Sequence, residues 1–159
     1  MNPNQTEETT EVVLVDTNVL SYVSKPSDSR CAPYQKHLEG KTVALSFITV
    51  GEIYSGIKKN NIGEKRIAEI EERISVAILI PFDIEICKAY ANLLGLKKNG
   101  STRAMEHNDR WIAACAIRHN LRLVTHNAKH FEDIPGLELI TESNTLSLWN
   151  EEDDKSIVL

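Results

Sequence analysis

Short runs rich in apolar residues recur along the chain and indicate strands, and a run without polar alternation suits a strand that is buried on both faces. The clearest run is Val12–Val15, which ends at Asp16. Further runs, two of them interrupted by Arg122 and Glu138, predict strands over residues 42–46, 77–80, 121–125 and 137–140. Such runs are typical of parallel sheets, because helices cover both faces of a parallel sheet. We expect the run at 137–140 to lie at an edge of the sheet.

Between these runs the apolar positions follow the period of a helix. In the helix expected from Thr49, one face carries Val50, Ile53, Tyr54 and Ile57. Asp83 can cap another helix, which should end near 97–100 and bury Ile86, Ala89, Tyr90, Leu93 and Leu94. Further helices are expected over 18–24, 30–39, 63–74 and 107–120. The alternation of strands and helices predicts an α/β fold, an α/β/α sandwich with a mostly parallel central sheet.

The excess of acidic over basic residues lies in the two ends of the chain. The 159 residues are enough for one domain and have a net charge of −5. We expect residues 1–11 to form a flexible acidic tail, 12–150 the folded domain, and 151–159 a second acidic tail. Without the tails the chain has 16 acidic and 17 basic residues, so its body is free to present a basic patch to a nucleic acid.

Cysteine usage and the start of the chain exclude several classes of protein. Three cysteines without a C-x-x-C spacing disfavour a disulfide framework and a cysteine-rich zinc site. The pairs His126/His130 and Cys115/His119 have a spacing that could bind zinc, but no further ligands accompany them. The first residues do not resemble a secretory signal, and no apolar run approaches the roughly 20 residues of a membrane span. A cytoplasmic protein without a membrane partner is therefore expected.

Polar side chains cluster where the predicted strands end. The triplet Asp16-Thr17-Asn18 follows the first strand, and Thr125-His126-Asn127 follows the fourth. In α/β sheets, ligands bind at the carboxyl ends of the strands. Asp109 lies on the apolar stripe of its own helix and therefore needs a partner there. For each aspartate taken alone, a helix cap is the simpler interpretation: Asp16 for the helix at 18, and Asn108 or Asp109 for the helix that follows them.

Glu52 is the third acid of interest, although it lies roughly opposite the apolar stripe of its helix and could be a surface residue. Gly51 and Gly56 are unusual in a helix and suggest a close approach of the backbone. Asp16, Glu52 and Asp109 come from three elements and can converge. Converging carboxylates repel one another unless a hard cation such as Mg²⁺ or Mn²⁺ lies between them. A metal-dependent phosphodiester hydrolase is therefore indicated.

Four stretches together resemble the signatures of PIN-domain ribonucleases, and in particular the VapC-type toxins of toxin–antitoxin pairs. They are Leu14–Leu20, Thr49–Gly56, Asn108–Ala114 and Leu123–Phe131, and the resemblance covers about residues 12–141. It implies a PIN-like three-layer sandwich, in which Asp16, Glu52 and Asp109 hold the cation. It further implies an RNA substrate, a small VapB-like antitoxin that occludes the site, and a homodimer. Thr125 and Asn127 match the polar residues that complete the pocket in that family. Together with Thr17 and Asn18 they would orient waters or phosphate oxygens.

One position departs from the pattern of the family. Many members have a fourth acid three residues after the position of Asn127, where this chain has His130. This departure leaves open whether one or two ions bind. An acidic site also needs basic residues around it to hold RNA, and Lys97, Lys98, Arg103 and Arg110 are candidates.

Two other functions remain open from the sequence. The chain could keep the PIN fold and act mainly by binding a partner, with weak catalysis, as the change at His130 would allow. Alternatively, the Asp16 motif could belong to a small-molecule phosphatase of the haloacid-dehalogenase type. Those enzymes need an aspartate two residues after the nucleophile, where this chain has Asn18, and this difference disfavours them.

Overall fold

A parallel five-stranded sheet forms the centre of the computed structural model, which describes residues 10–98, 101–102 and 105–142. The order of its strands is β3-β2-β1-β6-β7, and every neighbouring pair is parallel. The strands are β1 (Val12–Val15), β2 (Thr42–Ser46), β3 (Ile78–Ile80), β6 (Arg122–Val124) and β7 (Leu139–Ile140). The predicted α/β/α sandwich is confirmed, and so is the edge position of the last strand.

Side chains of β1 alternate between two apolar layers, because successive residues of a strand point to opposite faces. Val13 and Val15 join the core on one face, whereas Leu14 joins the core on the other. All three side chains are fully buried. The sheet is therefore covered on both sides, which explains why this strand has no polar alternation.

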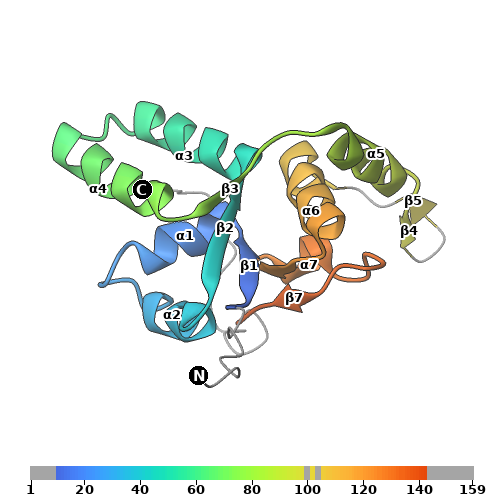
Figure 1. Ribbon diagram of the computed structural model, residues 1–159, viewed down its shortest axis with the longest axis horizontal. Coiled ribbons are helices and arrows are strands. Elements are labelled where there is room, and N and C mark those ends of the chain that lie inside the picture. Colours follow the sequence, from blue (N-terminus) through green and yellow to red (C-terminus); the bar gives the residue numbers. More distant parts are fainter. Residues whose placement is uncertain (1–9, 99–100, 103–104, 143–159) are drawn as a thin grey trace, which may run out of the picture.

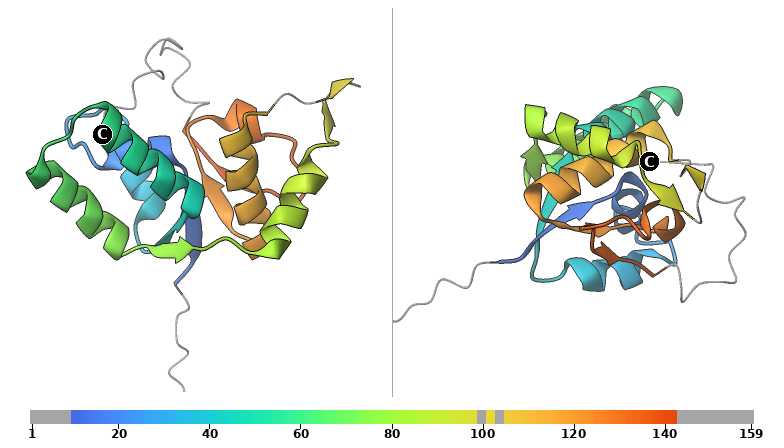
Figure 2. Two further views of the ribbon diagram at one scale, coloured as in Figure 1. Left: turned by 90° about the horizontal axis from the view of Figure 1, so that it is seen from above. Right: turned by 90° about the vertical axis from the view of Figure 1, so that its right-hand side faces the viewer.

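Four helices cover the first face of the sheet (Figure 1). They are α1 (Thr17–Val23), α2 (Cys31–Leu38), α3 (Phe47–Lys59) and α4 (Glu64–Ser75). Their buried side chains include Val19, Tyr34 and Ile53, which pack against β1 and β2. Seen from above, this group of helices and the remaining helices lie on opposite sides of the strands (Figure 2).

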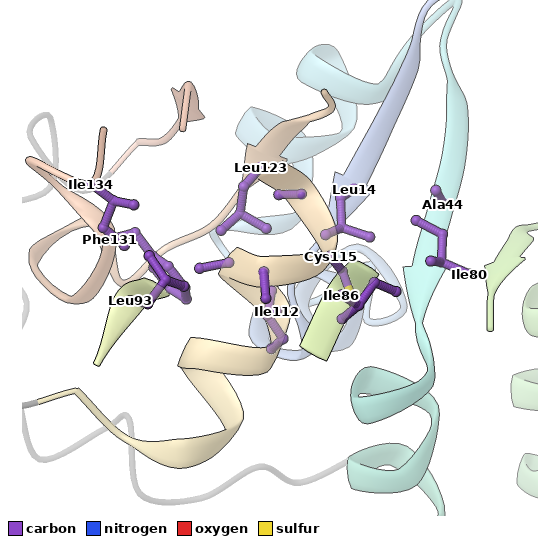
Figure 3. Packing of buried hydrophobic residues seen from close by; sticks show 13 residues of the cluster. Leu14, Ala44, Ile80, Ile86, Leu93, Ile112, Cys115, Leu123, Phe131 and Ile134 are labelled. Atoms are coloured by element: carbon purple, nitrogen blue, oxygen red, sulfur yellow. The ribbon is translucent and has the colours of Figure 1, made fainter. Parts of the chain in front are cut away.

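The second face is covered by α5 (Ile84–Leu93), α6 (His107–His119) and the short α7 (Ala128–Phe131). Ile86, Ile112 and Phe131 from these helices pack towards Leu14 and Leu123 of the sheet (Figure 3). This layer fixes α6 against the strands. The first turn of α6 consequently lies at the edge of the sheet where β1 and β6 end.

Several expected details are wrong. Tyr54 and Leu94 were expected to be buried but are 44% and 52% exposed. Tyr54 instead donates a hydrogen bond to Glu71 of α4, at 3.1 Å. The helix α5 ends at Leu93, before the flexible Gly95, instead of continuing to 97–100. A small antiparallel hairpin follows it, formed by β4 (Lys97–Lys98) and β5 (Ser101–Thr102).

Residue Glu11 is already attached to the sheet. Its carbonyl oxygen accepts a hydrogen bond from the Thr42 backbone, and its carboxylate pairs with Arg122. Thr10 is exposed, and the rest of the expected tails, residues 1–9 and 151–159, lies outside the described residues, as do residues 143–150 of the expected domain. Within the described ranges, no helix is both long enough and apolar enough to cross a membrane.

Candidate metal-dependent nuclease site

Asp16 ends β1 and begins α1, so its carboxylate lies at the carboxyl edge of the sheet. The expected capping role is confirmed, because Oδ1 accepts a hydrogen bond of 2.7 Å from the Thr17 backbone. The other oxygen, Oδ2, accepts a hydrogen bond of 2.8 Å from Thr125 Oγ1, at the end of β6. The residue is only 5% exposed. Its position is thus fixed by two neighbouring strands.

The ionised form of Asp16 is destabilised by its surroundings. Burial raises the pKa of this carboxyl from 3.8 to about 7, and the charges of Asp109 and Glu52 add to the increase. The hydrogen bonds from Thr125 and Thr17 act in the opposite direction but are outweighed. A buried carboxylate of this kind is stabilised when a positive charge lies next to it.

Glu52 extends from α3 towards the same edge, and two side chains from other elements hold it. Thr17 Oγ1 donates a hydrogen bond to Oε2, and Asn108 Nδ2 donates one of 2.6 Å to Oε1. The Glu52 side chain is half-buried. The simple interpretation as a surface acid is therefore wrong. A Cβ added at Gly51 would meet nothing within 4 Å, so the expected close approach of the backbone does not occur there.

Asn108 is a member of the cluster that sequence reasoning missed. The sequence alone suggests it only as a possible cap for the helix that contains Asp109. The helix α6 instead begins at His107, with Glu106 at the capping position and no side-chain hydrogen bond to the first turn. The expected cap by Asn108 or Asp109 is therefore wrong. Both side chains are directed elsewhere, Asn108 to Glu52 and Asp109 to His130.

Asp109 lies in the first turn of α6 and contacts His130 of α7. The distance from its Oδ2 to His130 Nδ1 is 2.6 Å. Burial raises the pKa of Asp109, and the charges of Glu52 and Glu106 act in the same direction. The hydrogen bond and the charge of His130 partly oppose this shift. Asp109 therefore has the partner that its place on an apolar stripe required.

The remaining predicted polar residues surround these acids. Thr125 is fully buried, and besides donating to Asp16 its hydroxyl accepts a hydrogen bond of 3.1 Å from the Asn127 backbone. Asn18 is half-buried in the first turn of α1. The structure therefore brings the three acids into electrostatic contact from β1, α3 and α6, with Thr17, Thr125 and Asn127 beside them.

Tyr34 supports Thr125 through the Thr125 backbone carbonyl, and the sequence alone does not indicate this contact. It is fully buried, and its hydroxyl donates a hydrogen bond of 3.2 Å to the Thr125 carbonyl oxygen. The same hydroxyl contacts His126 Nδ1 at 2.9 Å and accepts from the Glu142 backbone. This network holds the end of β6 in place, and with it the hydroxyl that binds Asp16.

The donor atoms of the cluster suit a hard divalent cation, since they are carboxylate, hydroxyl and amide oxygens. In the described part of the chain, no group of three or more His, Cys, Asp or Glu side chains is already arranged to coordinate a metal ion. The Glu52 and Asp109 carboxylates are engaged by Thr17, Asn108 and His130, so an ion would have to replace some of these hydrogen bonds. The buried carboxylate of Asp16, whose ionised form is destabilised, would favour that exchange.

A zinc site at Cys115 and His119 does not fit the structure. Cys115 is fully buried in the core, and burial raises the pKa of its thiol to about 12. The thiolate that zinc requires is therefore strongly disfavoured. His119 lies at the exposed end of α6.

The expectation that Arg110 could contact RNA phosphates is not supported. Its side chain is buried, donates to the Tyr90 hydroxyl at 3.1 Å and to the Met105 carbonyl at 3.0 Å, and packs over the Tyr90 ring. The backbones of Lys97 and Lys98 belong to the β4–β5 hairpin. Arg103 lies outside the described residues.

Comparisons with known proteins agree with this arrangement. Residues 13–137 match the family model described as PIN domain. Ribonuclease VapC1 of Haemophilus influenzae (strain R2866) is 34% identical over 132 residues, which covers 80% of this chain and 95% of that protein. The structure of VapBC2 from Rickettsia felis bound to a promoter DNA fragment superposes with a TM-score of 0.69 at 27% identity, over 82% of this chain and 98% of that chain. VapBC-1 from nontypeable Haemophilus influenzae gives 0.65 at 31% identity, over 82% and 97% of the two chains.

Proposed function

This chain belongs to the PIN-domain family, and from that premise we propose that it is an endoribonuclease, the toxin of a toxin–antitoxin pair. The observation that carries the proposal is the meeting of Asp16, Glu52 and Asp109 at the carboxyl edge of the sheet. The relatives named ribonuclease and the VapBC complexes support the same activity and a VapB-like partner.

The three carboxylates would hold a divalent cation, Mg²⁺ or Mn²⁺. A bound cation of this kind lowers the pKa of a water molecule and stabilises negative charge on a phosphate oxygen. Asp16 and Asp109 are the proposed ligands, and Glu52 is either a ligand or a base. Thr17 and Asn108 keep the Glu52 carboxylate turned towards the other two acids. Thr125 does the same for Asp16.

Asn18 and Asn127 are proposed to bind water or phosphate oxygens at the opening of this cluster. Both side chains are half-buried and follow the ends of β1 and β6. Amide groups at such a position can donate to a phosphate without adding charge to the site. RNA would thus meet polar donors before it meets the acids.

The proposal is tested by incubating the purified chain with RNA in Mg²⁺, in EDTA, and in EDTA followed by excess Mg²⁺ or Mn²⁺. We expect internal cleavage of the RNA that chelation abolishes and either ion restores. The product of a short neighbouring reading frame, the expected antitoxin, should suppress the cleavage. Undiminished cleavage in EDTA would exclude the metal-dependent mechanism, and an intact RNA under all conditions would favour the PIN-fold binding protein.

A further inference from the structure

Three polar groups converge on the outer side of the acidic cluster. His130 Nδ1 lies 2.6 Å from Asp109 Oδ2 and 2.6 Å from the side-chain amide nitrogen of Asn127. Asp109 comes from the first turn of α6, Asn127 precedes α7, and His130 lies within α7. The ring nitrogen therefore stands between a carboxylate and an amide that two different elements supply.

A single ring nitrogen cannot satisfy both neighbours in the same way. It carries either a proton or a lone pair, so it cannot donate to the Asp109 carboxylate while accepting from the Asn127 amide. The oxygen and nitrogen of a side-chain amide are interchangeable in shape, so the Asn127 oxygen can face the ring instead. When Nδ1 carries no proton in that arrangement, all three groups offer lone pairs. Lone pairs that face one another in this way are satisfied together by a cation between them.

The spacing is close to that of neighbouring ligands on one ion. Ligands about 2.1 Å from an octahedral ion are separated from their neighbours by about 3 Å. The observed separation of 2.6 Å between His130 Nδ1 and Asp109 Oδ2 needs an increase of only a few tenths of an ångström. A turn of the imidazole achieves this, because the His130 side chain is 44% exposed and is not fixed by the core.

We infer that His130 is a nitrogen ligand of the divalent cation at this site, and that it biases the site towards Mn²⁺ and other first-row transition ions over Mg²⁺. The inference rests on the proposed function for the existence of the cation. Its physical basis is the chemistry of the donor: imidazole suits transition ions, whereas Mg²⁺ prefers oxygen ligands and gives up its waters reluctantly.

The alternative role for His130 is to position Asp109 through a hydrogen bond. Substitution by glutamine separates the two roles, because glutamine can still hydrogen-bond to Asp109 but offers no imidazole. A positioning role predicts that His130→Gln leaves the preference between Mn²⁺ and Mg²⁺ unchanged. Substitution by aspartate replaces the nitrogen by oxygen and should move the preference towards Mg²⁺.

Calorimetric titration of Mn²⁺ and Mg²⁺ into the full chain gives the first test. For His130→Gln we expect Mn²⁺ affinity to fall by about tenfold or more, with a smaller change for Mg²⁺. For His130→Asp we expect the ratio of Mn²⁺ to Mg²⁺ affinity to fall as well, with tighter Mg²⁺ binding than in the wild type. His119→Gln is the matched control, since His119 is exposed at the opposite end of α6 from Asp109, and its affinity ratio should stay that of the wild type.

Pulsed electron paramagnetic resonance of bound Mn²⁺ detects the ligand directly. The wild type and His119→Gln should show the coupling of a coordinated nitrogen, and His130→Gln should lack it. Bound Mn²⁺ without nitrogen coupling in the wild type, or coupling that persists in His130→Gln, would overturn the role of His130 and leave the proposed nuclease intact. Absence of any Mn²⁺ and Mg²⁺ binding to the wild type would overturn the proposed metal site itself, and with it this inference.

Discussion

The two sides of the acidic cluster are built differently. Asp16 is enclosed by the sheet and held by Thr125 and the Thr17 backbone, whereas Asp109 reaches a partly exposed surface beside His130. Side chains of the enclosed side are fixed by the fold, because moving them would disturb β1 and β6. Side chains of the exposed side can exchange their hydrogen-bond partners without disturbing the core. We therefore propose that the enclosed carboxylate provides the metal binding on which hydrolysis depends, and that the exposed side determines which ion is preferred.

The largest effect is expected for Asp16→Asn, because this change removes a charge from the enclosed side while keeping the shape. RNA cleavage should fall by at least about 100-fold, beyond the usual loss for residues that only support a metal ligand. Cleavage rates under saturating Mg²⁺ measure the effect. The matched control is Asp133→Asn, an exposed aspartate with φ of 63°, which asparagine tolerates. Cleavage within twofold of the wild type by Asp16→Asn would refute the role of the enclosed carboxylate.

The raised pKa of Asp16 predicts that the stability of the metal-free protein depends on pH. Between the unfolded pKa of 3.8 and the folded pKa of about 7, the folded state binds the proton more tightly. The free energy of unfolding should therefore decrease as the pH rises through this window, by an amount on the order of 1 kcal/mol or more. Asp109, whose pKa is also raised, contributes in the same direction.

Urea unfolding at several pH values between 4 and 8, in EDTA, measures this dependence. The Asp16→Asn variant should have a shallower slope and a greater stability than the wild type at pH 8. An identical slope in both proteins would mean that the buried carboxyl is not the titrating group. Excess Mg²⁺ should bind the folded state and thereby offset the loss of stability of the wild type at high pH.

A smaller effect is expected for Thr17→Val, which keeps the buried shape but removes the hydroxyl that holds Glu52. Cleavage should fall by about tenfold, as is common when a partner of a metal ligand is lost. Thr17→Ser keeps the hydroxyl and should retain most of the activity. Equal rates for the valine and serine variants would show that this hydrogen bond does not position Glu52.

The smallest effect is expected for Asn108→Ala on the exposed side. Its hydrogen bond to Glu52 is 2.6 Å long but is exposed to solvent. A net contribution of roughly 0.5–1 kcal/mol corresponds to a decrease in cleavage of about two- to fivefold. Cleavage rates of Asn108→Ala and Thr17→Val, measured together, compare the two sides directly. A larger loss of cleavage for Asn108→Ala would contradict the greater importance of the enclosed side.

The sequence was most informative where local pattern and burial agree. The run Val12–Val15 is apolar throughout because the strand is buried on both faces, and Asp16 stands out because it ends that run. The positions along the chain of the other four strands of the sheet and of α1 to α6 followed from the same reasoning, whereas the short helix α7 was not predicted. The β4–β5 hairpin was missed because strands of two residues are too short to show a period.

The site was less predictable wherever its contacts are distant in the chain. Glu52 is held by Thr17 and Asn108, which are 35 and 56 residues away, and its own helix gives no sign of either. Tyr34 supports Thr125 across 91 residues. Periodicity describes the face of one helix, so it cannot show that a polar residue opposite the apolar stripe meets another element.

The carboxylates of both sides of the cluster are proposed to bind one cation together. Melting temperatures of the wild type and Asp109→Asn, with EDTA and with excess Mg²⁺ or Mn²⁺, test it most directly. We predict that the ion raises the melting temperature of the wild type and raises that of the variant clearly less, while the metal-free variant is at least as stable as the metal-free wild type. An equal increase in both proteins would contradict the shared site and remove Asp109 from it.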